Sequence, residues 1–377
     1  MALTDLFAQI ADRGKPKSAT ASAAQRAASV AAPFYGVGAY LNRVLHEIGV
    51  RKKRVLPARV ISVGNITLGG TGKTPFCIWL VERLKAEGAR PAILTRGYGR
   101  SQEARLVVVH DGKSLLANTR DAGDEPVLMA KALGDVPVIA CANRYHAGRY
   151  AIKKFAVDTL VLDDGFQHHA LARQGDIVLL DATRRLSSLE IFPRGTLRES
   201  PGALTRAHLI VLTRWQQAEN PAGALREAKK AAHGIPVVRS RMSIAGASRV
   251  SDRAPISLED LKGRKAFLLC AVGNPDSVKR TVKEAGLRLV GGRALPDHAR
   301  ITRAILLRAD AARRRAGADY IIVTEKDAVK LFELGSIPPE VTTLRIQVEM
   351  VSPQDEAIAL KAIRARLHAK AVCGYLR

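Results

Sequence analysis

The sequence predicts an α/β fold in which a mainly parallel sheet is flanked by helices and followed by a smaller C-terminal α/β lobe. Short apolar runs of β type alternate with stretches of helical periodicity along most of the chain, as in strand–helix–strand units. At 377 residues the chain is longer than one hydrophobic core usually serves, which indicates two lobes. With 47% hydrophobic and 25% charged residues, it is too rich in apolar side chains for a disordered chain.

Four segments are expected along the chain. Residues 1–33 are rich in Ala and Ser and are expected to form a flexible extension, and residues 34–54 an amphipathic helix with a basic run. Residues 55–235 contain a glycine-rich loop and are expected to form the core. In residues 236–377 the pattern first becomes irregular and polar and then returns to strands, which indicates a linker and a C-terminal lobe.

Buried strands are expected wherever a short apolar run of β type occurs. The first covers residues 60–63 and is followed by a glycine-rich turn and by helical periodicity over residues 76–85. Further strands are expected at residues 92–94, 106–109, 136–140, 159–162, 177–180 and 209–212 of the core, and at residues 266–269, 288–290 and 320–323 of the C-terminal lobe.

The N-terminal helix is predicted from apolar residues at helical spacing, namely Phe34, Val37, Leu41, Val44, Leu45 and Ile48. A basic run at residues 51–54 follows it directly. The pattern alone favours a helix packed on the body of the protein, and its alternative is a monotopic membrane contact with cations at anionic head groups. The sequence contains no run of about 18 apolar residues and no apolar signal region, so we expect a cytoplasmic protein.

The net charge of +25 points to an anionic partner, which could be a nucleotide, nucleic acid or an acidic membrane leaflet. A solvated basic surface is the default explanation of scattered Arg and Lys residues. Nucleic-acid binding is a rival hypothesis that rests on charge alone, because the sequence has no recognisable zinc finger, RRM aromatic motif or helix-turn-helix. The four cysteines form no C-x-x-C pair, which favours a reducing compartment.

A phosphate-binding loop is predicted at T-L-G-G-T-G-K-T, between a strand and a helix. Thr67 stands where the usual motif has its first Gly, and Gly69 and Gly70 partly offset this departure. Backbone N–H groups would face phosphate oxygens, Lys73 would reach the β and γ oxygens, and Thr74 would bind Mg²⁺. The residues expected to bind nucleotide are Thr67, Leu68, Gly69, Gly70, Thr71, Gly72, Lys73 and Thr74. The motif N-K-x-D of GTPases is absent, which favours ATP.

A carboxylate is expected beside the loop, because phosphoryl transfer from ATP uses Mg²⁺ held near the end of a neighbouring strand. Asp163 is the first candidate, with Asp164 next to it, and a cation or basic neighbour would make this pair tolerable. Asp181, at the end of another strand, is a competitor whose alternative role is to cap the following turn.

Eight short motifs in order resemble those of the tetraacyldisaccharide 4'-kinase family of lipid A biosynthesis. They are S-V-G-N-I-T at residues 62–67, T-R-G-Y-G-R at 95–100, G-D-E-P at 123–126, D-D-G-F-Q-H at 163–168, G-T-L-R-E at 195–199, G-N-P at 273–275, P-D-H at 296–298 and T-E-K-D at 324–327. The resemblance covers nearly the whole chain after about residue 34, and a Thr at the first loop position is a habit of this family.

The resemblance implies that the γ-phosphate of ATP is transferred to the 4'-hydroxyl of tetraacyldisaccharide 1-phosphate, giving lipid IVA. It also implies ATP and Mg²⁺ as cofactors, a P-loop NTPase-type core, and a peripheral or monotopic place at the cytoplasmic face of the inner membrane of a Gram-negative bacterium. The N-terminal helix would then contact anionic lipids. Neither nucleic acid nor an obligate protein partner is implied. The alternative function is that of a P-loop kinase or ATPase acting on a soluble metabolite.

The same resemblance assigns roles to individual residues. Asp124 would be the base on the acceptor hydroxyl, assisted by His298, and Lys73 would be the third catalytic residue. Without the family resemblance, His298 would be interpreted as a surface histidine. The metal ligands would come from Thr74, Asp163, Asp164 and Glu199, and Arg198 would contact ATP. Substrate would be bound by Arg96, Tyr98, Glu125, Arg144, Gln167 and His168. The chain departs from the family at Ser200, which follows Glu199, and at Ala299-Arg300, which follow His298.

Overall fold

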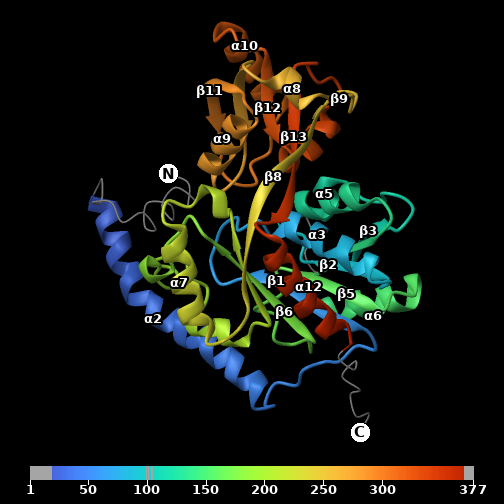
Figure 1. Cartoon of the computed structure of the whole chain (residues 1–377), viewed down its shortest axis with the longest axis vertical. Helices are drawn as coiled ribbons and strands as arrows, with labels where there is room; N and C mark the ends of the chain where they lie inside the picture. Colours follow the sequence, from blue (N-terminus) through green and yellow to red (C-terminus); the bar gives the residue numbers. More distant parts are fainter. Residues whose placement is uncertain (1–18, 99, 101, 103–104, 369–377) are drawn as a thin grey trace. The chain divides into compact units, whose positions relative to one another are not determined.

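The computed structural model describes residues 19–98, 100, 102 and 105–368, and two compact units are described in turn below. Unit 1 contains the residues up to Lys73, Asp158–Arg241 and those from Met350 onward, and unit 2 contains Thr74–Val157 and Met242–Glu349. Figure 1 names the helices and strands. The chain crosses from unit 1 to unit 2 inside strand β8, Val237–Arg249.

Unit 1 is built on parallel strands in the order β8-β7-β6-β1-β5. These are β1 (Arg59–Asn65), β5 (Thr159–Asp163), β6 (Gly175–Asp181), β7 (Leu209–Thr213) and the first residues of β8. Nearly every strand residue is buried, because helices and turns cover both faces, as parallel sheets require. The covering elements are α2 (Ala19–Glu47), α7 (Pro221–Ala232), α12 (Pro353–Leu367) and the 3₁₀ turns η1 (Leu186–Ser188), η2 (Pro201–Arg206) and η3 (Trp215–Gln217).

The first part of unit 2 contains three strands of a larger sheet, in the order β2-β4-β3. Strands β2 (Pro91–Thr95) and β4 (Pro137–Ala140) are parallel, whereas β3 (Val107–Asp111) runs antiparallel to β4. The helices of this part are α3 (Lys73–Ala86), α4 (Thr119–Ala122), α5 (Asp124–Leu133) and α6 (Arg144–Phe155). An apolar run predicts a strand but not its direction, so the antiparallel β3 was not foreseen.

The second part of unit 2 contains parallel strands in the order β11-β10-β12-β13. Its elements are β9 (Pro255–Ile256), α8 (Leu258–Leu261), β10 (Lys265–Cys270), α9 (Pro275–Glu284), β11 (Arg288–Ala294), α10 (Arg303–Arg315), β12 (Tyr320–Thr324), α11 (Glu325–Leu331), η4 (Phe332–Leu334) and β13 (Val341–Met350).

Two apolar clusters cover the faces of this sheet. Phe267 and Leu269 join the cluster under α10 and α11, while Leu268 and Cys270 join the cluster under α8 and α9, which is the alternation of a strand. The α/β prediction with a mainly parallel sheet flanked by helices is therefore confirmed.

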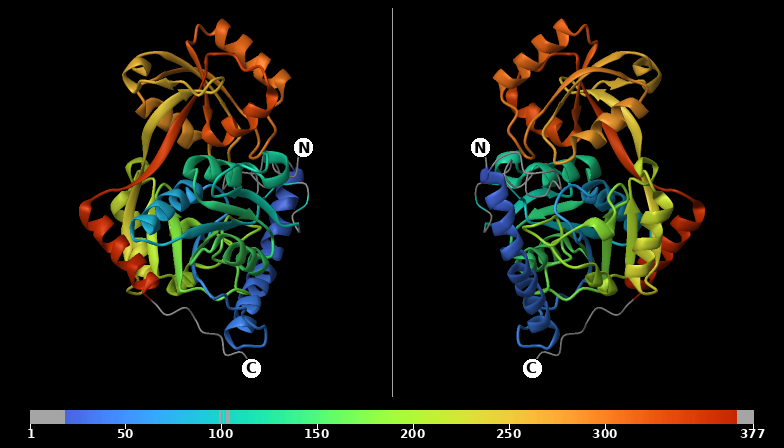
Figure 2. Two further views of the ribbon diagram at one scale, coloured as in Figure 1. Left: turned by 90° about the vertical axis from the view of Figure 1, so that its right-hand side faces the viewer. Right: turned by 90° about the vertical axis from the view of Figure 1, so that its left-hand side faces the viewer.

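Helix α2 begins at Ala19, earlier than the predicted Phe34, because the Ala-rich sequence before Phe34 has high helix propensity. Ala28 and Ala32 are buried, whereas the side chain of Phe34 is 75% exposed and that of Leu41 is 50% exposed. Figure 2 shows α2 in blue as one long helix. No helix among the described residues is long and apolar enough to cross a membrane. Residues 1–18 of the predicted extension lie outside the described residues.

Strand β1 and the segment after β5 approach each other closely at Gly64. A Cβ atom on Gly64 would lie 2.6 Å from Phe166 Cβ and 2.8 Å from its backbone nitrogen. Phe166 is fully buried in the core of unit 1, where close packing prevents it from shifting away. The approach fixes the end of β1, from which the glycine-rich loop departs.

We expect Gly64→Ala to lower the free energy of unfolding by about 1–3 kcal/mol, because the added methyl group overpacks a backbone contact. Gly38→Ala is the matched control: nothing lies within 4 Å of its Cβ position, and alanine favours the helix in which it lies. Chemical denaturation of both variants measures the effect. An equal stability of Gly64→Ala and wild type would contradict the packing described.

Candidate active site

The glycine-rich loop connects the end of β1 to the start of α3 at Lys73. Gly69 and Gly72 have φ values of 99° and 84°, which glycine adopts without strain. Thr71 anchors the loop: its Oγ1 accepts a hydrogen bond from Asn65 Nδ2 at 3.0 Å, and its carbonyl accepts one from Thr213 Oγ1 at 2.9 Å. Strands β1 and β7 thus both hold the loop at Thr71, and the loop lies between a strand and a helix as predicted.

The carboxylate of Asp164 lies between two cations. Lys73 Nζ is 3.5 Å from its Oδ1, and Arg198 Nη1 donates to its Oδ2 at 2.8 Å. Burial raises the pKa of this carboxyl, but Lys73 and Arg198 outweigh burial, so the pKa lies below its ordinary value. Asp164 has a φ of 51°, a conformation that costs a non-glycine residue energy. Asp163 ends β5 and is buried.

Glu199, predicted as a metal ligand, is held by Arg206. The two side chains form two hydrogen bonds of 2.8 and 3.0 Å, and Gln167 Nε2 donates to Glu199 Oε1 at 2.9 Å. Gln167 also donates to the carbonyl of Asn65 at 3.0 Å. Burial raises the pKa of Glu199, and the bonds from Arg206 outweigh it, so the carboxyl stays ionised.

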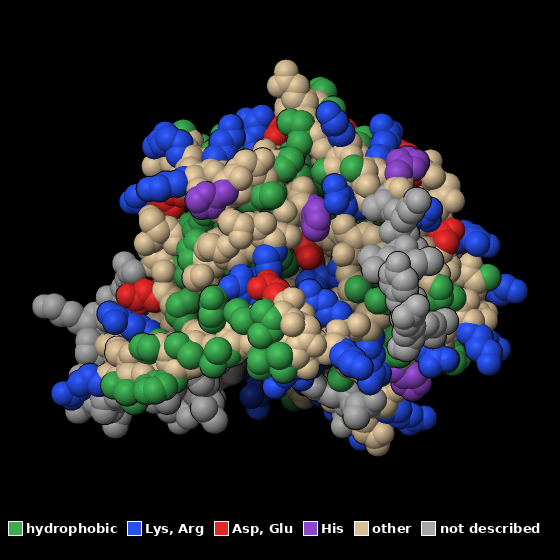
Figure 3. Space-filling model, turned by 90° about the horizontal axis from the view of Figure 1, so that it is seen from below, with side chains coloured by type: hydrophobic (Ala, Val, Ile, Leu, Met, Phe, Trp, Pro, Cys, Tyr) green, Lys and Arg blue, Asp and Glu red, His purple; other side chains and the backbone are tan. Residues whose placement is uncertain are grey.

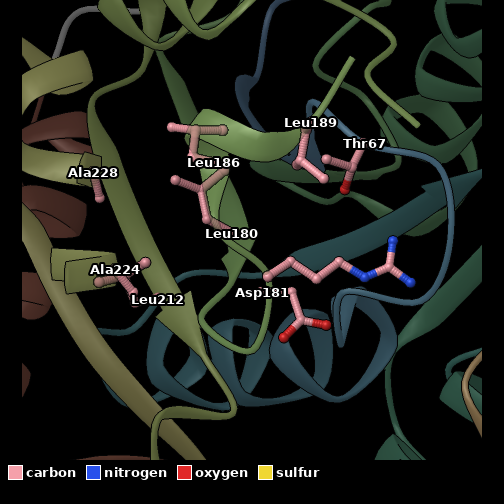
Figure 4. A pocket seen from close by; sticks show the side chains of 9 residues that line it. Thr67, Leu180, Asp181, Leu186, Leu189, Leu212, Ala224 and Ala228 are labelled. Carbon is pink, nitrogen blue, oxygen red and sulfur yellow. The ribbon is translucent and has the colours of Figure 1, made fainter. Parts of the chain in front are cut away.

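Asp181 caps the turn that follows β6, which is the alternative role predicted for it. Its Oδ1 accepts hydrogen bonds from the backbone N–H and the hydroxyl of Thr183, and Arg214 Nη1 lies 2.5 Å from its Oδ2. It lines a hollow of about 20 Å³ together with Thr67. Figure 4 shows these two polar side chains on one side of the hollow and Ala224 and Ala228 of α7 on the other.

A larger cavity of about 370 Å³ in unit 1 is lined by α2, by residues after β5 and by residues between β6 and β7. Its lining residues are Tyr35, Gly38, Ala39, Asn42, Gln167, His169, Arg198 and Glu199. Burial, with Arg206 nearby, lowers the pKa of His169 to about 4, so this wall of the cavity carries a neutral imidazole near pH 7.

Asp124 and His298 meet in unit 2, although they are far apart in the sequence. Asp124 is the first residue of α5, and His298 lies in the turn after β11 with a φ of 60°. His298 Nδ1 is 3.3 Å from Asp124 Oδ2, and Lys330 Nζ is 2.9 Å from the same oxygen. Burial raises the pKa of Asp124, but the contacts with His298 and Lys330 outweigh it and hold the pKa below its usual range.

The other predicted substrate ligands differ in their surroundings. The Tyr98 ring lies 5.5 Å from that of His298 and is 64% exposed, and Glu125 follows Asp124 in α5. Arg96 is exposed and His168 is half-buried. Arg144 is buried and donates to the carbonyls of residues 141 and 142, so it closes the turn before α6.

Sequence reasoning missed Lys330, Lys326 and Arg206 as neighbours of the predicted site residues. The local signals for the two lysines are the T-E-K-D motif, which contains Lys326, and their spacing of four residues in α11, which puts them on one helix face. Arg206 lies in η2, where no pattern distinguishes it from other surface arginines.

A sequence model of the family described as "Tetraacyldisaccharide-1-P 4'-kinase" matches residues 24–367. The chain belongs to the tetraacyldisaccharide 4'-kinase family. Its activity is that of a tetraacyldisaccharide 4'-kinase of lipid A biosynthesis, so the predicted family, function and enzyme class are confirmed.

Two tetraacyldisaccharide 4'-kinases illustrate the similarity. The one from Anaeromyxobacter sp. (strain Fw109-5) is 39% identical over 336 residues, 88% of this chain and 90% of its own length, and the one from Syntrophus aciditrophicus is 36% identical over 329 residues, 85% and 88% of the two chains. The solved structure of LpxK from Aquifex aeolicus in complex with ATP has a TM-score of 0.70 and 28% identity, covering 89% of this chain and 98% of that one.

Glu325 in the first turn of α11 gives this kinase a pH-dependent stability. Its carboxylate accepts a hydrogen bond from the N–H of Ile346 at 3.0 Å, and burial raises its pKa to about 7. Between its ordinary pKa and about 7 the unfolded chain releases this proton while the folded chain keeps it. The free energy of unfolding therefore falls as the pH rises through this window.

We expect Glu325→Gln to keep a side-chain oxygen that accepts the hydrogen bond from the N–H of Ile346. The variant should no longer lose stability as the pH rises. The variant should be more stable than wild type by about 1–3 kcal/mol at pH 8 and equally stable near pH 4.5. Denaturation curves at both pH values measure the difference. Glu259→Gln, at an exposed ion pair, is the control and should show no such pH dependence. A Glu325→Gln variant with no gain at pH 8 would contradict the burial of this carboxyl.

Proposed function

We propose that this kinase transfers the γ-phosphate of ATP to its lipid acceptor with Asp124 as the base and His298 as its partner. The observation that carries the proposal is the contact of 3.3 Å between the Asp124 carboxylate and His298 Nδ1. An ionised carboxylate is ready to accept a proton, and an imidazole at this distance orients the carboxylate.

In the proposed reaction, Asp124 takes the proton of the 4'-hydroxyl while the hydroxyl oxygen bonds to the γ-phosphorus. The bond from this phosphorus to the oxygen bridging the β and γ positions breaks, and ADP leaves with the electron pair. Lys73 and Arg198, which face Asp164 in the structure, would turn to the phosphates of ATP and offset their charge. The loop residues 67–74 would supply backbone N–H groups.

The residues of this chain fit a Mg²⁺ ion that is bound together with the phosphates of a nucleotide. The described residues contain no group of three or more His, Cys, Asp or Glu side chains suited to a metal ion. Mg²⁺ commonly needs only one or two carboxylates beside substrate phosphates and water. We therefore propose the Thr74 hydroxyl and a carboxylate of Asp163 or Asp164 as its ligands, while both oxygens of Glu199 bind Arg206. A bound Mg²⁺ neutralises charge on the phosphates.

The remaining assignments are proposals of the same kind. Arg96, Tyr98, Glu125, Gln167 and His168 would bind the sugar or its phosphate, whereas Arg144 would support α6. We also propose that the core is of the P-loop NTPase type and that a smaller C-terminal α/β lobe follows it.

We further propose that α2 contacts the cytoplasmic face of the inner membrane. Apolar side chains on it face solvent, namely Val30, Phe34, Val37, Tyr40 and Leu41, and Lys and Arg at residues 51–54 are exposed. The space-filling view shows a band of apolar side chains with Lys and Arg at its edges (Figure 3). An acceptor with four acyl chains stays in the membrane, so an exposed apolar helix bordered by cations suits the task.

We expect Asp124→Asn and His298→Ala each to lower kcat by about 10²-fold or more, because each removes part of the base. The double variant should be little worse than either single one, since the two residues act as a unit. Transfer of radiolabelled phosphate to the disaccharide lipid measures kcat. Asp121→Asn, an exposed carboxylate of the same segment, is the control. Near-wild-type turnover of either single variant would refute the proposed base.

For the membrane contact, Phe34→Glu combined with Leu41→Glu should abolish flotation with vesicles of anionic phospholipid, because two charges would enter the apolar face. Leu307→Glu, at a side chain 54% exposed on α10, is the matched control and should float as wild type does. Flotation of the double variant at the wild-type level would rule out α2 as the membrane contact. An acyl-free disaccharide phosphorylated as fast as the lipid would favour a soluble acceptor.

A further inference from the structure

Helix α11 begins at the T-E-K-D motif, whose residues anchor it to the end of β10. Thr324 Oγ1 accepts a hydrogen bond from the N–H of Asp327 at 3.1 Å and donates to its Oδ2 at 2.7 Å. The same Oδ2 accepts from the N–H of Ala271 at 3.0 Å. Asp327 is fully buried, so this joint is protected from water. The first turn of α11 is thereby fixed relative to the sheet of unit 2.

Lys330 lies one turn into this helix and is only 7% exposed. Its Nζ is 2.9 Å from Asp124 Oδ2, 3.3 Å from the carbonyl oxygen of Ala299, and 3.5 Å from Asp327 Oδ1. These partners hold the ammonium group against the dyad carboxylate. The contact neutralises a carboxylate whose burial would otherwise be costly.

Lys326, four residues earlier on the same face, contacts the other member of the dyad. Its Nζ is 3.1 Å from His298 Nε2, 3.2 Å from Asp297 Oδ1 and 3.5 Å from Glu125 Oε1. Burial lowers the pKa of this lysine, but the carboxylates of Glu125 and Asp297 outweigh it and raise the pKa, so the side chain is an ammonium.

An ammonium group only donates hydrogen bonds, so His298 Nε2 accepts in the contact with Lys326. The ring proton of the neutral imidazole then lies on Nδ1, which faces Asp124. Asp297 Oδ1 is the one carboxylate oxygen near Nε2 among the described contacts, and at 3.9 Å it is too far to take a proton from this nitrogen. The geometry therefore selects one tautomer of His298.

We propose that Lys326 and Lys330 are positioning residues of the phosphoryl transfer: Lys326 holds His298 in the tautomer whose Nδ1–H faces Asp124, and Lys330 holds the Asp124 carboxylate in place. This inference rests on the proposed role of Asp124 as the base. It explains why Asp124 and not His298 accepts the proton of the hydroxyl, since one ring nitrogen is protonated and the other is occupied by Lys326.

Nitrogen-15 NMR of protein with labelled histidine tests the tautomer without any turnover. The His298 resonances, assigned by their loss in His298→Ala, should show a protonated Nδ1 and an unprotonated Nε2 at pH 8 in wild type. In Lys326→Met they should shift toward a mixture of the two tautomers, and Lys326→Arg should restore the wild-type pattern because it keeps a donor. A protonated Nε2 in wild type, or unchanged resonances in Lys326→Met, would overturn the role of Lys326.

Kinetics test the consequence for the reaction. Lys326→Met and Lys330→Met should each lower kcat about 10-fold or more and leave KM for ATP within about 2-fold, because neither lysine belongs to the nucleotide-binding residues proposed above. Lys279→Met, at an exposed ion pair on α9, is the control. If Lys330→Met unfolds, Asp124→Asn combined with Lys330→Met should refold, since it removes both buried charges.

The outcomes separate this inference from the proposed base. Near-wild-type turnover of Asp124→Asn defeats the proposed base, and the tautomer of His298 then still decides whether Lys326 positions the ring. Loss of turnover in Asp124→Asn together with wild-type kcat in Lys326→Met and Lys330→Met defeats the positioning roles alone. A double variant at positions 124 and 330 that remains unfolded contradicts the charge pairing.

Discussion

Pairing of half-buried carboxylates with cations is the constraint on which this kinase depends. Asp164 lies between Lys73 and Arg198, and Asp124 lies against Lys330. A buried ion that loses its partner costs several kcal/mol, so each pair fixes the segments from which its members come. The pairs also keep the carboxylates ionised, the form in which they bind cations or accept a proton. Structure and chemistry here rest on the same contacts.

Local patterns in the sequence predicted those parts of the molecule whose causes are local. The apolar run at residues 60–63 lies inside β1, and the glycines at positions 69 and 72 have the positive φ values that a phosphate loop uses. Apolar runs do not predict the direction of a strand, because direction depends on the neighbouring strand with which it pairs. Strand β3, which is antiparallel to β4, is the example. Residues 19–33 belong to α2, whereas their Ala-rich composition predicts a flexible extension.

The candidate site followed from family resemblance more than from residue chemistry. Taken alone, His298 beside Asp297 is an ordinary surface histidine, and only the fold brings it to Asp124. Lys326 stands in the T-E-K-D motif and Lys330 outside it, but no motif shows what these side chains contact, because their partners come from α5 and from the turn after β11. Their spacing in a helix shows that they share a face but not what that face meets.

We propose that two sets of side chains divide the chemistry: the loop residues as far as Lys73 bind the phosphates of ATP, and Asp124 acts on the acceptor. A single-turnover measurement of phosphoryl transfer by Asp124→Asn, with the Kd for ATP measured on the same preparation, tests this division. We predict a wild-type Kd for ATP and a chemical step slowed by about 10²-fold or more. An equal loss of ATP binding, or a chemical step at the wild-type rate, would contradict the account.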